Sequence, residues 1–147
     1  MISNMEKQEL YIILKTRLKI ALQQEFYLEA VMIEYNIIDD RVSSMLKHAG
    51  ITYLRSDGKN MDLLPKIKKV RNATRDRRKP IYRKVPDELM EKTDEWRVIR
   101  NKLVHERCQN IYDSEEVKQC ALEGNELVRQ LSNAAKAVNR AAEKINN

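Results

Sequence analysis

Glycine and proline are scarce in this chain, with 3 of each among 147 residues. A β-sandwich needs many tight turns, which these two residues usually supply, so their scarcity argues against an all-β fold. Hydrophobic residues make up 42% of the chain and charged residues 34%, a balance typical of globular proteins. A chain of this length buries roughly 70% of its surface on folding. We therefore expect one mostly helical domain over residues 1–147.

Two long helical patterns occupy the first third of the chain. The sequence Ser3-x-x-Glu6 predicts a capping box, followed by apolar residues at helical spacing. A second pattern, Gln23–Lys47, is either continuous with the first helix or separated from it near its start. Its apolar residues cover more than one stripe, which indicates a helix buried on two sides. Gly50 follows this pattern and fits a C-terminal cap.

Two more long helices are expected in the second half. Pro86 suits the first position of a helix that runs to about Glu106. The sequence Asp113-x-x-Glu116 is suited to cap a last helix that reaches about Ile145. The expected fold class is therefore all-α, a bundle of four long helices plus one short extra helix.

The positive charge of the chain is concentrated in one segment at about residues 61–85. We expect a short helix over residues 61–71 and a mobile loop over residues 72–85. The net charge of the chain is +6. The basic residues of the segment are Lys66, Lys68, Lys69, Arg71, Arg75, Arg77, Arg78, Lys79, Arg83 and Lys84. Such a block binds polyanions by counterion release, so we expect it to contact nucleic acid. A solvated loop and a surface for acidic lipid head groups are the alternatives.

Metal and membrane sites find little support in the sequence. The two cysteines, Cys108 and Cys120, form no CxxC pair, and only two histidines are present. We therefore expect no metal and no cofactor. The N-terminus lacks the apolar stretch of a signal peptide, and no apolar run is long enough to cross a bilayer. These features predict a cytoplasmic protein that does not bind membranes.

The hexamer from Arg100 to His105 carries the most chemical information. On a helix, five positions place Arg100 and His105 about 140° apart, where both can border one cleft at the helix end. Asn101 and His105 share a face. Arginine grips phosphate and histidine exchanges protons, which suffices for metal-free RNA cleavage. The structural alternative is that Arg100 simply pairs with Asp94 or Glu95.

A second arginine and histidine occur at a similar spacing. Arg41 and His48 lie seven positions apart and share one helix face. His48 is expected at a helix C-terminus, where a cation is favoured in any case, and Arg41 lies beside two aspartates. We therefore favour the hexamer as the functional pair.

The sequence R-N-K-L-V-H on the penultimate long helix resembles the R-x(4–6)-H motif of the HEPN family (higher eukaryotes and prokaryotes nucleotide-binding domains). The second helix, EFYLEAVMIEYNIIDDRVSSMLKH, is similar to the central helix of that family. The resemblance implies a HEPN-like helical bundle, a metal-independent endoribonuclease and a homodimer. It also implies that Arg100 and His105 are catalytic and that Asn101 supports them. HEPN toxins that pair with nucleotidyltransferase antitoxins carry a modified tyrosine two residues after the histidine, where this chain has Arg107.

These features together lead to one principal hypothesis and one rival. The principal hypothesis is an RNA-cleaving toxin or phage-defence protein, with an antitoxin or regulatory protein as a further partner. A two-fold dimer would bring two copies of Arg100, Asn101 and His105 to one axis, because such an interface repeats the same patch. Apolar residues of the second helix and the stripe around Trp96 would supply the contact. The rival is a non-catalytic HEPN-like module that binds nucleic acid or a protein.

Overall fold

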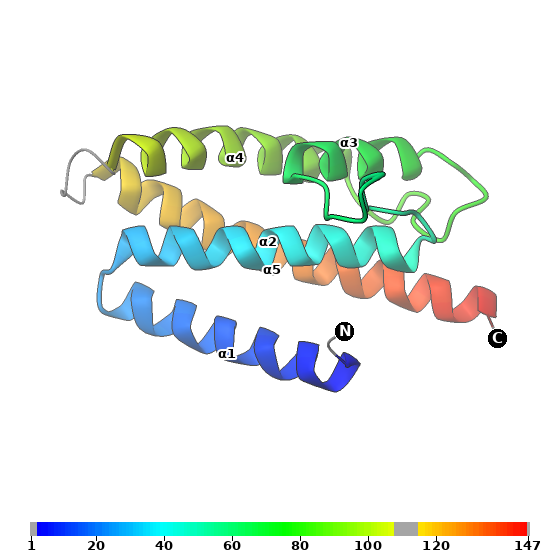
Figure 1. The fold of residues 1–147 in the computed structure, drawn as a ribbon, viewed down its shortest axis with the longest axis horizontal. Coiled ribbons are helices and arrows are strands. Elements are labelled where there is room, and N and C mark those ends of the chain that lie inside the picture. The colour runs from blue at the N-terminus through cyan, green and yellow to red at the C-terminus, as the bar shows by residue number, and fades with distance from the viewer. Residues whose placement is uncertain (1–2, 108–114, 147) are drawn as a thin grey trace.

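The computed structural model describes residues 3–107 and 115–146 (Figure 1). This part of the chain is all-helical and contains no strand, as the sequence predicts. Its five helices are α1 (Asn4–Gln23), α2 (Tyr27–His48), α3 (Leu63–Ala73), α4 (Asp87–Arg107) and α5 (Glu115–Asn146). Four of them have 20 residues or more and α3 has 11, which agrees with the expected lengths.

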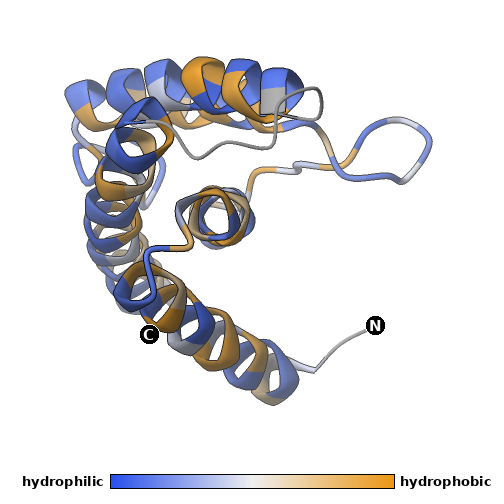
Figure 2. Cartoon of the chain, turned by 90° about the vertical axis from the view of Figure 1, so that its left-hand side faces the viewer, coloured by the Kyte–Doolittle hydropathy of each residue, from blue (hydrophilic) through white to orange (hydrophobic). Residues whose placement is uncertain are grey.

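Helix α2 is the centre of the molecule. Figure 2 shows it inside an arc formed by α4, α5 and α1, and it contacts all four other helices. The predicted burial on two sides is confirmed. The buried residues of α2 are Ala30, Val31, Glu34, Ile37, Ile38, Val42, Met45 and Leu46.

The predicted start of α1 and the predicted C-terminal cap of α2 are confirmed, but α2 begins at Tyr27 and the predicted start at Gln23 is wrong. Ser3 and Glu6 form both hydrogen bonds of the capping box, at 2.7 and 3.2 Å. At the end of α2, Gly50 adopts φ +74°, in the left-handed region. There the amide of Ile51 donates to the carbonyl oxygen of Leu46 at 2.9 Å, which completes a Schellman motif. The chain breaks between the two helices, so α1 and α2 are separate.

The predicted start of α4 is wrong by one residue. Pro86 precedes the helix, and its carbonyl oxygen accepts from the amide of Leu89 at 3.1 Å, so it is the N-cap residue. The end of α4 agrees with the prediction to one residue. Asp113, the predicted cap of α5, and Cys108 lie outside the described residues.

Residues 74–86 of the basic segment form a compact connection that packs on the bundle, whereas the sequence predicts a mobile loop over residues 72–85. The hydroxyl of Thr74 lies 3.3 Å from the carbonyl oxygens of both Ile81 and Val85. Ile81 and Val85 are buried in the core. Two apolar anchors within a charge-rich sequence therefore fold residues 74–86 onto the bundle.

The burial of two groups of apolar residues differs from what the sequence predicts. Trp96 is buried, and its indole Nε1 donates to the carbonyl oxygen of Cys120 at 2.9 Å. It therefore packs within one chain and cannot supply a dimer contact. On α1, Leu10 and Ile13 are about half exposed, although their spacing predicts burial. None of the helices in the described residues has an apolar stretch long enough to span a bilayer.

Candidate functional site

Arg100 lies half-buried in the seam between α4 and α2. Its guanidinium carbon is 3.9 Å from the centre of the Tyr35 ring. The Nη1 atom donates to Oδ1 of Asn101 at 3.0 Å, and Nη2 lies 3.6 Å from the sulfur of Met32. Aromatic stacking and a neighbouring amide thus hold the guanidinium in one place.

No carboxylate pairs with Arg100 within the described residues. Asp94, which the sequence offers as a partner, instead binds Arg97 at 2.9 Å. The Nε atom of Arg100 is buried and has no hydrogen-bond partner. Burial lowers the pKa of Arg100, but an arginine stays charged in proteins. The described part of the chain therefore provides no counterion for this positive charge.

Asn101 and His105 lie on the solvent side of α4, and both side chains are exposed. Arg100 is directed toward α2, so α4 separates it from His105, whereas the sequence predicts that both border one cleft at the helix end. The His105 ring makes no hydrogen bond within the part of the chain that the structure describes. A single chain therefore does not enclose Arg100 and His105 in one cleft.

A buried glutamate near this site is missed by the sequence reasoning. The carboxyl group of Glu34 is fully buried, and neither of its oxygens has a hydrogen-bond partner among the described residues. Burial raises its pKa to about 9, so the group is neutral at pH 7. Gly124 on α5 makes room for it, because a Cβ there would collide with the carboxyl group and lie 2.9 Å from Cζ2 of Trp96. The signal was present in the sequence, since this acid lies inside the apolar stripe of α2.

The unpartnered groups lie in one region. Within the described residues, the buried side-chain atoms without a hydrogen-bond partner are the two oxygens of Glu34 and Nε of Arg100. Both residues lie where α2, α4 and α5 meet, next to Tyr35 and Trp96. Proteins satisfy nearly all buried polar groups, so a local concentration of exceptions calls for an explanation.

Lys66, predicted to bind nucleic acid, is buried instead. Its ammonium group donates to Oδ1 of Asp39 and to Oγ of Ser43, both at 2.9 Å. Only 1% of its side chain is exposed. Lys66 therefore joins α3 to α2 and presents no charge to a ligand at the surface.

The other nine basic residues of the segment are at least partly exposed, but several are already paired. Arg71 binds Asp87 with two hydrogen bonds of 2.9 Å, and Arg78 binds Asp76 at 3.1 Å. Arg75 lies 3.9 Å from the carboxylate of Asp87. The residues without an ion pair in the described structure are Lys68, Lys69, Arg77, Lys79, Arg83 and Lys84. The cationic surface is thus smaller than the sequence suggests.

The basic segment and the Arg100 site lie at opposite ends of α4. Figure 1 shows α3 and the following loop near the start of α4, whereas His105 belongs to its last turns. A helix of 21 residues is roughly 30 Å long. Arg100 lies roughly 20 Å along this helix, so within one chain an RNA that touches both regions must follow most of α4.

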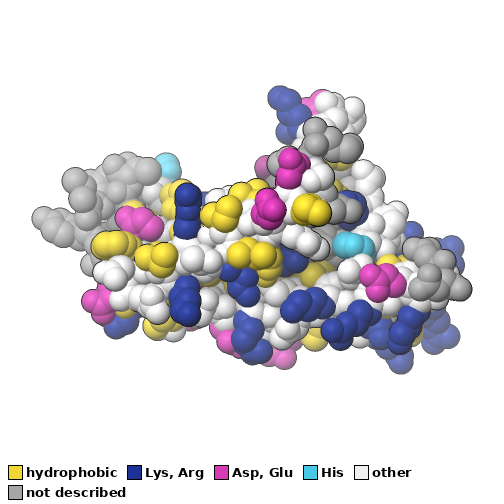
Figure 3. Space-filling view, turned by 90° about the horizontal axis from the view of Figure 1, so that it is seen from below, with side chains coloured by type: hydrophobic (Ala, Val, Ile, Leu, Met, Phe, Trp, Pro, Cys, Tyr) yellow, Lys and Arg dark blue, Asp and Glu magenta, His cyan; other side chains and the backbone are white. Residues whose placement is uncertain are grey.

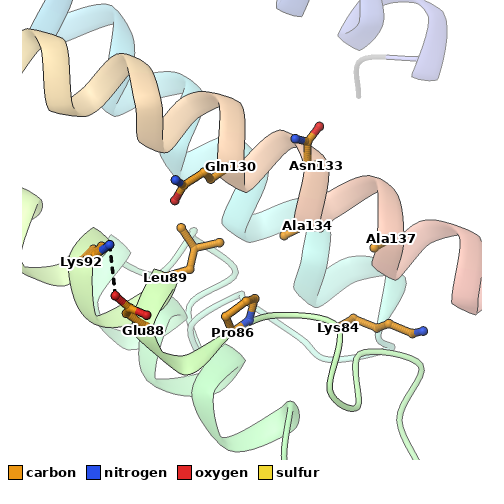
Figure 4. Close-up of a pocket in the computed structure, with 9 residues that line it drawn as sticks. All are labelled: Lys84, Pro86, Glu88, Leu89, Lys92, Gln130, Asn133, Ala134 and Ala137. Carbon is orange, nitrogen blue, oxygen red and sulfur yellow. Dashed lines mark ion pairs between the residues drawn. The ribbon is translucent and has the colours of Figure 1, made fainter.

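A groove of about 460 Å³ separates the start of α4 from the middle of α5. Figure 4 shows Leu89 and Ala134 facing each other across it, with Lys84 at one end. An ion pair of 3.2 Å between Glu88 and Lys92 lies along one side. Neither Arg100 nor His105 lines this groove, so it is separate from the candidate catalytic residues.

Arg41 and His48, the second arginine–histidine pair, lie near the end of α2 and both have partners. Nε of Arg41 donates to Oδ2 of Asp40 at 3.2 Å. Nδ1 of His48 lies 2.8 Å from the carbonyl oxygen of Ser44. The charge of Arg41 is thus compensated, unlike that of Arg100.

Comparison of the chain with protein-family models, with curated proteins and with solved structures finds no match. Among the described residues, no group of three or more His, Cys, Asp and Glu side chains is arranged to hold a metal ion. The functional argument therefore rests on the chemistry of the site itself.

Proposed function

We propose that this protein is a HEPN-like, metal-independent endoribonuclease that uses Arg100 and His105. The observation that carries the proposal is the Arg100 guanidinium, held on the Tyr35 ring without a carboxylate partner. A fixed cation in a partly desolvated site is suited to stabilise the charge that develops on a phosphate in the transition state. Asn101 holds that guanidinium through Nη1, so we assign it a positioning role.

His105 would provide proton transfer. In its neutral form it accepts the proton of a ribose 2′-hydroxyl as the 2′-oxygen attacks the adjacent phosphorus atom. The bond from phosphorus to the 5′-oxygen breaks, and that oxygen takes up a proton. The products are a 2′,3′-cyclic phosphate and a 5′-hydroxyl. The exposure of His105 suits this role, because RNA can reach the ring.

A homodimer would complete the site. The reaction needs one group that accepts a proton and another that donates one, and His105 is the one histidine near Arg100. Apolar side chains close to Arg100 are about half exposed, namely Met32, Val98 and Ile99. We propose that a second copy covers this surface and that His105 of the partner subunit supplies the second group.

The charge distribution supports RNA as the substrate. The unpaired cations of the basic segment would hold the phosphate backbone without reading its sequence. The wider role that we propose is a toxin or defence nuclease under the control of a regulatory protein.

A non-catalytic binding module is the second candidate. The observation in its favour is that one chain directs Arg100 and His105 to different sides of α4. If no dimer forms, these two residues cannot act on one phosphate. The same surface would then serve only to bind RNA or a protein.

Cleavage of a mixed RNA substrate in the presence of EDTA tests the proposal. We expect cleavage to persist without free metal and to leave 2′,3′-cyclic phosphate ends. Sedimentation at micromolar concentration should show a dimer in the same buffer. Intact RNA at high protein concentration, together with RNA binding, would favour the binding module.

A further inference from the structure

A second polar site lies at the opposite end of α2 from Arg100. A hollow of about 480 Å³ is bordered by the start of α1, the last turns of α2 and the end of α5. Figure 3 shows the side of the molecule that carries α1, with Lys and Arg side chains gathered toward the end where α2 and α5 finish. The side chains that line this hollow are mostly polar or charged.

The floor of the hollow is rigidly built. The guanidinium carbon of Arg41 lies 4.3 Å from the centre of the Tyr11 ring. The hydroxyl of Tyr11 is 2.6 Å from Oγ of Ser132 on α5, which fixes the ring. Asp40 binds Arg41 through Nε and Nη2, so Nη1 remains without a hydrogen bond in the described structure. Arg41 therefore offers the two N–H donors of Nη1 from a prearranged position.

His48 is also prearranged. Its Nδ1 atom lies 2.8 Å from the carbonyl oxygen of Ser44, so Nδ1 carries a proton and donates it there. The opposite ring nitrogen, Nε2, makes no hydrogen bond within the described residues. A protonated His48 can donate from Nε2 to an anion in the hollow, which it lines.

The charge of the lining favours an anion. Arg41, Lys7 and Lys47 outnumber the two carboxylates, Asp40 and Glu143, even when His48 is neutral. One of those carboxylates is already held by Arg41. The two lysines form no ion pair in the described part of the chain, so their charges remain available to a ligand.

We propose that this hollow binds a phosphate monoester of nucleotide size. Its volume lies within the range of small-molecule pockets. Arg41, Lys47 and His48 would contact the phosphate, and the uncommitted carboxylate of Glu143 would accept hydrogen bonds from sugar hydroxyls. A free nucleotide and the 5′-phosphorylated end of an RNA share this chemistry. The proposal does not depend on the ribonuclease activity, because none of its residues belongs to the Arg100 site.

Proton NMR of the two imidazole rings tests the proposal, since the chain has only two histidines. A His105→Gln variant assigns the signals. On titration with adenosine 5′-monophosphate we expect the His48 signal to move at lower ligand concentration than the His105 signal. Inorganic phosphate should produce the same selective shift at higher concentration, and adenosine should produce none. Unmoved signals with the monophosphate, or equal shifts of both rings, would overturn the proposal.

A matched pair of variants adds a binding readout. Lys47→Gln removes an exposed cation of the hollow and should weaken the affinity for adenosine 5′-monophosphate by about 5- to 10-fold. Lys19→Gln removes an exposed cation of α1 that does not line the hollow and should leave the affinity unchanged. Equal affinities of the two variants would contradict the assignment of the site.

Competition separates the two sources of the ligand. A short oligoribonucleotide with a 5′-phosphate should displace the monophosphate if the hollow captures RNA ends, and the same oligonucleotide with a 5′-hydroxyl should not. If neither displaces it while the selective His48 shift remains, the ligand is a free nucleotide.

Discussion

The two halves of α2 treat buried polar groups in opposite ways. In the first half, within residues 3–107 and 115–146, Glu34 has no hydrogen-bond partner and Arg100 packs on Tyr35 without a carboxylate. In the second half, Lys66 is bound by Asp39 and Ser43, as described above. The same helix therefore supports one unsatisfied region and one satisfied region.

The difference has an energetic meaning. An unpaired buried polar group costs about 1–3 kcal/mol, more if it is charged. A carboxylate beside Arg100 would remove this cost, as Asp39 does beside Lys66. Proteins keep such costs mainly where function requires them. The first half of α2 is therefore the better candidate for chemistry, and its free guanidinium is what a phosphate would pair with.

The largest expected effect is on RNA cleavage. Arg100→Ala and His105→Ala should each reduce the rate by about 10²- to 10⁴-fold, because each removes a group that acts in the transition state. Arg100→Lys should recover little, since lysine lacks the planar fork of donors. Cleavage rates and circular dichroism should be measured together, with unchanged helical content.

Arg97→Gln is the matched control for this comparison. Arg97 lies one turn before Arg100 on α4, but it is bound by Asp94. Its loss should leave cleavage close to normal. If Arg97→Gln lowers the rate as much as Arg100→Ala, the lack of a carboxylate partner does not mark the functional arginine.

The second effect concerns the stability of the unsatisfied region as a function of pH. Burial raises the pKa of Glu34 from 4.5 to about 9, so the folded state keeps a proton that the unfolded chain releases. The contribution of this group to stability is thus fully present below pH 4.5 and is lost as the pH rises toward 9. The free energy of unfolding should fall by about 1.4 kcal/mol per pH unit in that interval from this group alone.

Glu34→Gln should remove this slope, because the amide has nearly the same shape and does not ionise. Urea unfolding of both proteins between about pH 5 and about pH 8 measures it. Cys120, whose pKa burial raises to about 12, also favours the protonated folded state, but only near the top of this interval. Glu123→Gln, an exposed change on α5, is the control. A slope that survives in Glu34→Gln would show that other groups cause it.

The sequence predicted the helices better than the partners of their side chains. Helix ends follow from local rules, so the Ser3–Glu6 cap and the Gly50 C-cap could be found from a few neighbouring residues. Whether a charged residue is paired depends on another helix. Lys66 looked like part of a solvated charge run because its partner Asp39 is 27 positions away. An even larger separation in sequence hid the fact that Arg100 meets an aromatic ring of α2 and no acid.

The third effect tests the satisfied region. Asp39→Ala would leave the buried ammonium of Lys66 without its carboxylate, although Ser43 would still accept from it. Removing one partner of a buried pair typically costs 3–5 kcal/mol, and we expect about 3 kcal/mol because 36% of the Asp39 side chain is exposed. Lys66→Met keeps the packing without a buried charge and should cost much less. Urea unfolding distinguishes the two.

Asp87→Ala is the control for that prediction, since it breaks the exposed pair with Arg71. It should change the unfolding midpoint very little. A loss equal to that of Asp39→Ala would mean that burial does not distinguish the two ion pairs.

The smallest expected effect is on RNA binding, where it depends on whether an arginine of the basic segment already has an acidic partner. Arg77 and Arg78 are adjacent and exposed, but Arg78 is held by Asp76, whose pKa it lowers through their hydrogen bonds. A cation that is already neutralised releases fewer counterions from RNA. Arg77→Gln should therefore reduce the slope of log affinity against log salt by roughly 0.7 to 1, uniformly across RNA sequences, and Arg78→Gln by less.

Combined neutralisation of Arg75, Arg77, Arg78 and Lys79 should give the largest reduction. Filter binding at several salt concentrations measures these slopes. An unchanged slope in the combined variant would show that the basic segment does not contact RNA, and equal slopes in the two single variants would show that Asp76 releases Arg78 when RNA binds.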